Sequence, residues 1–410
     1  MMQEIKKAVS SIQTISGLVL FACLPIHFNE VTRWSMILFI ALSIIDYFLQ
    51  ARYKNHSFFS LKSLPFWSLI GLYLLLLLYI PYETANQYIP LFTENRAAFL
   101  AFGVLGVVGT NVPPRKYIAH TCIMVSLLLV LYTLYLGWQY PPENPVNWRE
   151  HINYIRHVNI QSHMVVNMYL NMGIIACFWL IKEYKKYRFY WILPMLILYT
   201  TIALSDGRVG FVSSHVILLI GIFYLCWEKY KKILIGLIIG SSLAGVIALS
   251  YNDKIATLLT AQEDIRHNIW STSLALYQEN PYWGVGASTN AINLMERFSA
   301  DPIIQKNRYL IKSFSLPYIS GAHPHNQLLQ GAMEFGILGL LLTLAALLGP
   351  LLYCLRNKSS LLVLAGLIVM LIQLQSEVIS GSIGYLAFCY YLLLAMNYAQ
   401  QSSKKVVGSV

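Results

Sequence analysis

Apolar residues fall in blocks of roughly 17–25 residues along this chain, the length that an α-helix needs to cross the hydrocarbon core of a bilayer. Charged residues make up only 11% of the 410 residues, whereas soluble domains carry about 25%. The pattern predicts an all-α, polytopic membrane protein with about 12 transmembrane helices. The expected spans are 12–27, 34–50, 64–81, 97–112, 117–138, 162–181, 189–205, 209–227, 233–250, 327–353, 360–380 and 384–400.

The net charge of +11 would suit a nucleic-acid ligand, but the positions of the basic residues argue against one. They gather in short loops between the apolar blocks, as the positive-inside rule predicts for a membrane protein with both termini in the cytoplasm. In this orientation the inner basic residues are mostly lysine, and the outer ones are mostly arginine. Because the arginine fork binds phosphate through two hydrogen bonds, an arginine-rich outer face favours a phosphate ligand there. The outer arginines are Arg33, Arg96, Arg149, Arg156, Arg208, Arg266, Arg297 and Arg308.

A long loop before the tenth expected span divides the chain into three parts. Residues 1–250 form the first nine helices with short loops, residues 251–325 form the large outer loop, and residues 326–410 form the last three helices and a cytoplasmic C-terminus. Apolar residues at helical spacing between Asp253 and Asn280 predict an amphipathic helix, which Pro281 ends. Such a helix could lie flat on the membrane surface. Gly284-Val285-Gly286 then predicts a turn.

Polar residues gather at the exit of this loop, directly before an apolar block. His323, His325 and Asn326 stand there, with Pro324 between the two histidines. Polar groups at a membrane entrance are costly, and histidine can accept a proton near neutral pH. This cluster is a candidate catalytic site, although histidines here could also serve only as helix-capping or interfacial residues.

Three arginines are further candidates for binding an anion, and Asp206 could orient or neutralise one of them, Arg208. Arg208 and Asp206 share a short outer turn, Arg266 lies on the amphipathic helix of the loop, and Arg96 lies at an outer helix start. Each has an alternative interpretation: an interfacial arginine that extends toward the headgroups, or a solvated run of charges. Glu334 is an acid inside the tenth span, about 13 Å along a helix from His325 and too far to pair with it.

Several motifs of other enzymes are missing from the sequence. We find no H-E-x-x-H metal motif, Walker-A loop, Asp-x-Asp pair or G-x-S-x-G nucleophile motif, and the six cysteines form no C-x-x-C pair. A reaction that uses arginines and a histidine, with neither metal nor cofactor, fits the residues that remain.

The loop exit carries a spaced motif. His325-Asn326 is followed by nine residues and then by Gly336-Ile337-Leu338-Gly339. In this pattern and in its helix layout the chain resembles the bacterial O-antigen ligases of the O-antigen ligase and polymerase superfamily. The resemblance implies that the large loop is periplasmic and that the protein lies in the bacterial inner membrane.

The same resemblance implies a reaction. An undecaprenyl-diphosphate-linked glycan would be transferred, with inversion, to a sugar hydroxyl of lipid A-core. His325, Arg208 and Arg266 would be the catalytic residues, and His323, Asn326, Arg96 and Asp206 would contact the substrates. The other partners would be membrane lipids, with no nucleic acid.

Three other functions remain open. An O-antigen polymerase or an O-linked protein glycosyltransferase would use the same superfamily layout. A transporter or flippase would also have about 12 spans, but it would place its polar residues near the middle of the bilayer. The candidate residues here gather at the outer face instead.

Overall fold

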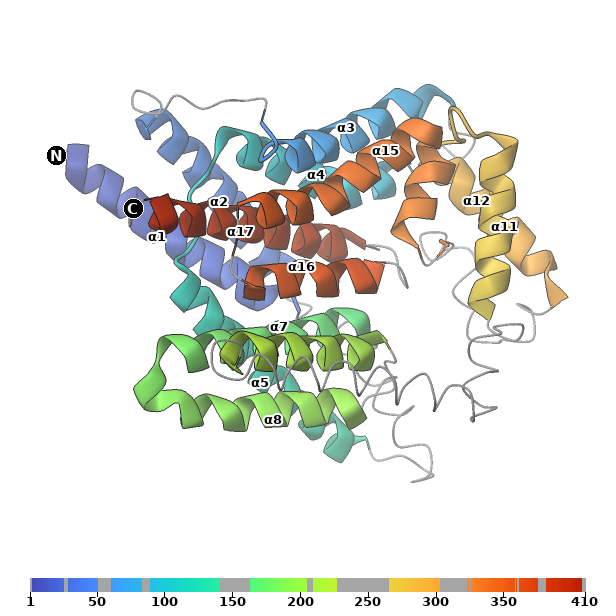
Figure 1. Cartoon of the computed structure of the whole chain (residues 1–410). Helices are drawn as coiled ribbons and strands as arrows, with labels where there is room; N and C mark the ends of the chain where they lie inside the picture. The colour runs from blue at the N-terminus through green and yellow to red at the C-terminus, as the bar shows by residue number, and fades with distance from the viewer. Residues whose placement is uncertain are drawn as a thin grey trace.

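The computed structural model describes residues 2–25, 29–50, 60–82, 89–140, 163–204, 209–226, 265–302, 323–324, 326–357, 359, 361–374 and 381–407. Within them the chain is helical, with no strand, which agrees with the expected all-α class (Figure 1). The α-helices are α1 (Met2–Cys23), α2 (Asn29–Gln50), α3 (Leu64–Tyr79), α4 (Ile89–Val108), α5 (Arg115–Gln139), α7 (His163–Glu183), α8 (Arg188–Leu204), an unlabelled helix at Val209–Cys226, α11 (Ile265–Glu279), α12 (Ala287–Ala300), α15 (Gln327–Arg356), α16 (Leu361–Leu374) and α17 (Gly381–Val407). Two short 3-10 helices, Ile80–Tyr82 and Lys185–Tyr187, follow α3 and precede α8.

Five of the described helices are long and apolar enough to cross a membrane: Glu30–Leu49, Arg115–Gln139, Lys185–Leu204, Val209–Cys226 and Gln327–Arg356. Leu64–Tyr79, Arg96–Val108 and Leu362–Leu374 are shorter apolar helices. A multi-pass membrane protein is therefore confirmed, and its number of crossings stays a prediction. Each expected span overlaps a helix, except that 233–250 lies outside the described residues.

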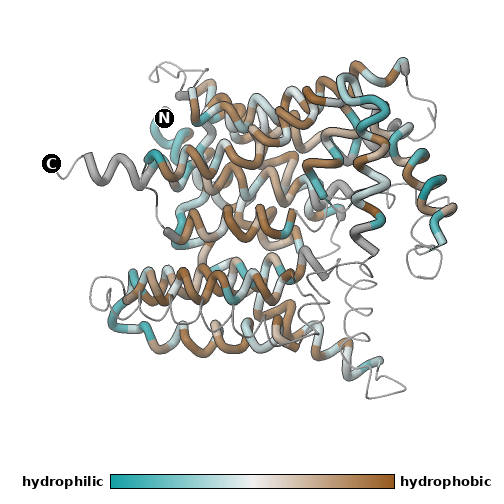
Figure 2. The backbone as a smooth tube through the Cα atoms, turned by 45° about the vertical axis from the view of Figure 1, so that its right-hand side comes forward, coloured by the Kyte–Doolittle hydropathy of each residue, from teal (hydrophilic) through white to brown (hydrophobic). Residues whose placement is uncertain are grey.

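The long helices form a bundle with a distinct end (Figure 1). α3 packs on α4 and α15, α4 packs on α17, and α7 packs on α5, α8 and α16. α11 and α12 stand at one end of this bundle, which we call the loop end, while the start of α1 and the end of α17 lie at the opposite end. Hydrophobic residues follow the long helices, and hydrophilic residues gather at their ends and on α11 and α12 (Figure 2).

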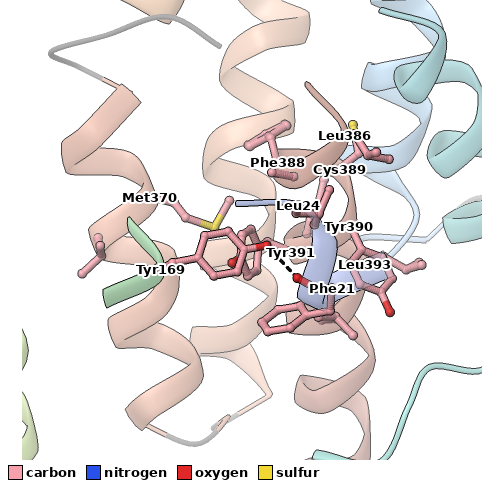
Figure 3. Close-up of a cluster of buried hydrophobic side chains, with 14 of the residues drawn as sticks. Phe21, Leu24, Tyr169, Met370, Leu386, Phe388, Cys389, Tyr390, Tyr391 and Leu393 are labelled. Atoms are coloured by element: carbon pink, nitrogen blue, oxygen red, sulfur yellow. Dashed lines mark hydrogen bonds between the residues drawn. The ribbon is translucent and has the colours of Figure 1, made fainter. Parts of the chain in front are cut away.

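Buried aromatic rings join α1, α7 and α17 in the core (Figure 3). The Phe21 ring lies 5.6 Å from the rings of Tyr169 and Tyr391, measured between centroids. The Tyr169 hydroxyl donates to the Phe21 carbonyl at 3.0 Å, and the Tyr390 hydroxyl donates to the Gly17 carbonyl at 2.8 Å. Because lipid tails are as apolar as these side chains, hydrogen bonds and close packing hold the helices together here.

α15 is not the single continuous span expected at 327–353. Phe335 and Gly336 leave the helical conformation and divide it into a short arm, residues 327–334, and a long helix, residues 337–356. Gly336 has φ +62°, which costs an L-residue energy but glycine little. The two halves then touch at their backbones, because a Cβ added at Gly339 would lie only 2.1 Å from the Gly331 carbonyl oxygen. The hydropathy of the segment gave no sign of this break.

The expected amphipathic helix of the loop is described from Ile265 onward as α11, and it ends at Glu279, before Pro281. Its apolar stripe does not remain free to lie on a membrane surface. Ile269 and Leu276 are buried against the apolar side chains of α12 and α15, which are Leu294, Phe298 and Met333. Residues 253–264 of the expected helix lie outside the described residues, as do the expected domain boundary at 250–251 and residue 325 of the second boundary.

Candidate active site

The short arm of α15 begins with the asparagine of the sequence motif. Asn326 has an extended backbone, and its side-chain Oδ1 accepts hydrogen bonds from the backbone N–H groups of Leu328 and Leu329, at 3.0 and 3.2 Å. Asn326 is therefore the N-cap of the arm, a position that asparagine favours. His323 is half-buried just before it. His325 lies outside the described residues.

The arm ends in a buried ion pair that sequence reasoning did not find. Arg96 Nη1 and Nη2 donate to the two carboxylate oxygens of Glu334 at 2.6 and 2.5 Å, and Arg96 Nε donates to the Tyr385 hydroxyl at 3.1 Å. The Gln330 amide, one turn earlier on the arm, also donates to Glu334. The side chains of Arg96 and Glu334 are only 6% and 2% exposed. An acid inside a span needs a partner, but spacing in the sequence could not name this one.

The turn at 281–286 closes over the break in α15. The N–H groups of Val285 and Gly286 donate to the carbonyls of Met333 and Glu334 at 3.1 and 2.8 Å, and Ile337 N–H donates to the Pro281 carbonyl at 2.9 Å. These bonds satisfy backbone groups that the interrupted helix would otherwise leave unpaired. The expected turn at Gly284-Val285-Gly286 is confirmed, with φ +72° and +84° at its two glycines.

The break in α15, the Arg96–Glu334 pair and the 281–286 turn together form what we call the polar corner. α3 supports this corner from the other side. The Tyr79 hydroxyl donates to the Trp283 carbonyl, and the Tyr79 ring packs edge-on against Phe335, with centroids 5.4 Å apart. The Tyr282 and Trp283 side chains are 74% and 76% exposed, as is common for aromatic residues at a membrane interface. The corner thus joins α3, α4, α15, α17 and the 281–286 turn.

The other expected site residues are only partly described. Arg208 and Asp206 lie outside the described residues, and so does the side chain of Arg266, whose backbone lies in the first turn of α11. The helices next to these residues in the sequence lie at the loop end of the bundle. The C-terminal end of α8 and α11 both lie there (Figure 1), and α11 packs directly on α15. After Arg208 the next helix begins against α7, where the Asn171 amide donates to the Gly210 carbonyl at 3.1 Å.

An apolar crevice lies elsewhere in the bundle, between α5 and α7 on one side and α16 and α17 on the other. Met172, Ile175, Gly366 and Met370 are among its lining residues, and Arg115 is the one charged side chain among the described residues that line it. An apolar lining suits a hydrocarbon chain rather than a diphosphate or a sugar. The crevice is therefore separate from the polar corner in both place and chemistry.

These features define a polytopic α-helical membrane protein with a polar corner at the end of its bundle, built by a broken helix and covered by two loop helices. Residues 193–344 match the family model described as O-antigen ligase, so this part of the chain is an O-antigen ligase family domain. The match runs from α8 through α11 and α12 and across the break in α15. The family implies glycan transfer of the O-antigen ligase or polymerase type, with lipid-linked glycans as substrates. No curated protein matches the chain.

Proposed function

We propose that the protein is an O-antigen ligase of the bacterial inner membrane, with both termini in the cytoplasm and its loop end facing the periplasm. It transfers a glycan from undecaprenyl diphosphate to a sugar hydroxyl of lipid A-core, with inversion and without a metal. The observation that carries the proposal is the family match, which includes both the segment around Arg208 and the broken helix behind His325.

In the proposed reaction, the acceptor oxygen attacks the anomeric carbon of the glycan. The bond from that carbon to the diphosphate oxygen breaks, and undecaprenyl diphosphate leaves with the electron pair. His325 takes the acceptor proton as general base. Arg208 and Arg266 stabilise the negative charge that develops on the diphosphate, and Asp206 orients Arg208. His323 contacts the acceptor.

A structural observation also supports this proposal. The side chain of Asn326 caps the short arm, so the asparagine of the His325-Asn326 motif has a defined place at a helix start.

The test is a gel of lipopolysaccharide from a strain that lacks the gene, complemented with wild type, His325→Ala or His120→Ala. His120 is a matched control because it is a half-buried histidine on α5, bonded to the Lys116 carbonyl and far in sequence from the motif. We expect wild type and His120→Ala to restore the ladder of O-antigen bands. With His325→Ala we expect no ladder and polymer that accumulates on the carrier lipid.

The family also implies the polymerase type of reaction. This alternative would give a different gel. Lipopolysaccharide that carries a single repeat unit in the deletion strain would identify a polymerase. An unchanged ladder would reject both activities and favour protein glycosylation or transport.

A further inference from the structure

We propose that the Arg96–Glu334 pair is a positioning device that fixes the short arm of α15, whose capping residue Asn326 directly follows the proposed base His325 in the sequence; this inference rests on the proposed function. Arg96 was expected from sequence to contact the substrate anion. Its surroundings favour a different role, because both nitrogens of its fork are engaged by Glu334 and its Nε by Tyr385.

The carboxylate of Glu334 is a junction between three helices. It receives two hydrogen bonds from Arg96 on α4 and one from Gln330 on its own arm, and Arg96 is bonded in turn to Tyr385 on α17. The pair is almost fully buried. A charge buried this deeply is strongly destabilising without its partner, so the two side chains hold α4, α15 and α17 in one arrangement.

The backbone of the same residue binds the turn. The Glu334 carbonyl accepts from Gly286 N–H at 2.8 Å, and the neighbouring Met333 carbonyl accepts from Val285 N–H at 3.1 Å. Glu334 therefore contacts α4 through its side chain and the 281–286 turn through its main chain. A change at this carboxylate would reach the turn as well as the arm.

The arm is too short to fix its own direction. Residues 327–334 span about 12 Å at 1.5 Å per residue, and isolated helices shorter than about 12–15 residues are marginal. The arm is held at its start by the Asn326 cap and at its end by Glu334. His325 directly precedes that cap, so a tilt of the arm would displace it. Misplacement of a reacting group by about 1 Å can cost a hundredfold in rate.

The two roles for Arg96 predict different kinetics. A residue that contacts the donor in both the ground state and the transition state affects mainly KM, whereas a residue that positions the base affects kcat. Glu334 and Tyr385 use three of the five N–H donors of the Arg96 guanidinium, and the Arg96 side chain is only 6% exposed, so a phosphate could reach it only if the buried pair rearranged.

The experiment uses the purified full chain in lipid nanodiscs, with lipid-linked glycan as donor and lipid A-core as acceptor. Glu334→Gln removes the charge but keeps the shape of the side chain. We expect kcat to fall about tenfold or more, while the donor KM changes less than about threefold. Amide hydrogen exchange at Val285 and Gly286 should become faster, because their acceptors lie on the loosened end of the arm.

Glu279→Gln is the matched control. Glu279 forms an ion pair with Arg297 on the loop helices, at 2.8 Å, but the two side chains are 51% and 39% exposed. Exposed pairs contribute little, so kcat, KM and exchange should stay at wild-type values. If Glu334→Gln does not fold, Tyr385→Phe replaces it. That variant removes only the hydroxyl that accepts from Arg96 Nε, and kcat should fall about two- to fivefold with an unchanged KM.

Unchanged kcat and unchanged exchange in the folded variants would overturn the proposal. So would an Arg96→Lys variant in which the donor KM rises and kcat does not change, because that result would make Arg96 a substrate contact. If the wild-type protein transfers no glycan, the proposed function is rejected. Faster exchange in Glu334→Gln would then still show that the ion pair fixes the short arm.

Discussion

Arg96 on α4 and Glu334 on α15 form a two-bond ion pair between positions 238 residues apart in the sequence. The pair lies where α15 breaks, beside the carbonyls that bind the 281–286 turn. Removing one partner of a buried ion pair strongly lowers the free energy of unfolding. The intact pair, however, often stabilises a protein no more than apolar side chains of the same size would.

The first prediction separates these two effects. Glu334→Leu alone leaves Arg96 charged and buried, and we expect it to lower the free energy of unfolding by about 3–5 kcal/mol. Arg96→Met combined with Glu334→Leu removes both charges, and we expect stability near that of wild type. Thermal unfolding of the purified protein in one detergent measures both. A double variant that is as unstable as the single one would contradict the argument.

The second prediction concerns the left-handed residue at the break. Gly336→Ala would place a Cβ 2.2 Å from the Tyr282 carbonyl oxygen at φ +62°. Backbone strain alone should cost about 1–3 kcal/mol, and glycan transfer should fall sharply as the turn is displaced. Gly366→Ala is the control, since its Cβ would meet nothing nearer than 3.6 Å. Equal stability of the two variants would mean that the break does not require glycine.

Asn326 supports a third prediction, which separates capping from substrate contact. Asn326→Ala should destabilise the arm by about 1 kcal/mol and reduce activity. Asn326→Asp and Asn326→Ser keep an oxygen that can accept from Leu328 and Leu329, so activity should largely return. Loss of activity in all three variants, with normal unfolding temperatures for Asp and Ser, would favour a direct substrate contact.

Packing of the loop helices gives the fourth prediction. Ile269 is 1% exposed and packs with the apolar side chains of α12 and α15. Ile269→Ala should lower stability by about 2–5 kcal/mol. Leu274 on the same helix is 44% exposed, so Leu274→Ala should stay within about 0.5 kcal/mol of wild type. Denaturant unfolding, followed by tryptophan fluorescence, would compare them.

Arg208 provides the fifth prediction, which tests whether charge or shape matters at the outer turn. Arg208→Lys keeps the charge but loses the planar fork that binds a phosphate through two hydrogen bonds. We expect glycan transfer to fall by about tenfold or more, as judged by the O-antigen ladder and by initial rates. Full activity would show that only a positive charge is needed.

The helices could be predicted because they depend on local composition. An apolar block of span length has few alternatives in lipid, so α5 and α8 appear close to where hydropathy places them. The end of α11 before Pro281 and the glycine turn after it are likewise local, since proline and glycine act on their own backbone.

The corner could not be predicted, because its causes lie far apart in the sequence. Glu334 and Gly336 lie at the break, but neither residue type by itself ends a helix. The break depends on hydrogen bonds from the 281–286 turn and on a partner on α4. The motif glycine at 336 was found as a pattern, but its left-handed conformation and its contact with Tyr282 are tertiary facts. The same holds for the apolar stripe of α11, which could have faced a membrane and is covered by α12 and α15 instead.

The break in α15 also changes how this chain should be mapped with reporter enzymes. The 30 residues from Gln327 to Arg356 have the hydropathy of one long crossing, yet the part after the break, residues 337–356, is long enough alone to cover about 30 Å, a full bilayer core. Reporters fused within residues 327–334 should therefore still report the compartment of α11 and α12. A fusion scan would see the switch of compartment only after Gly336, later than a hydropathy plot suggests.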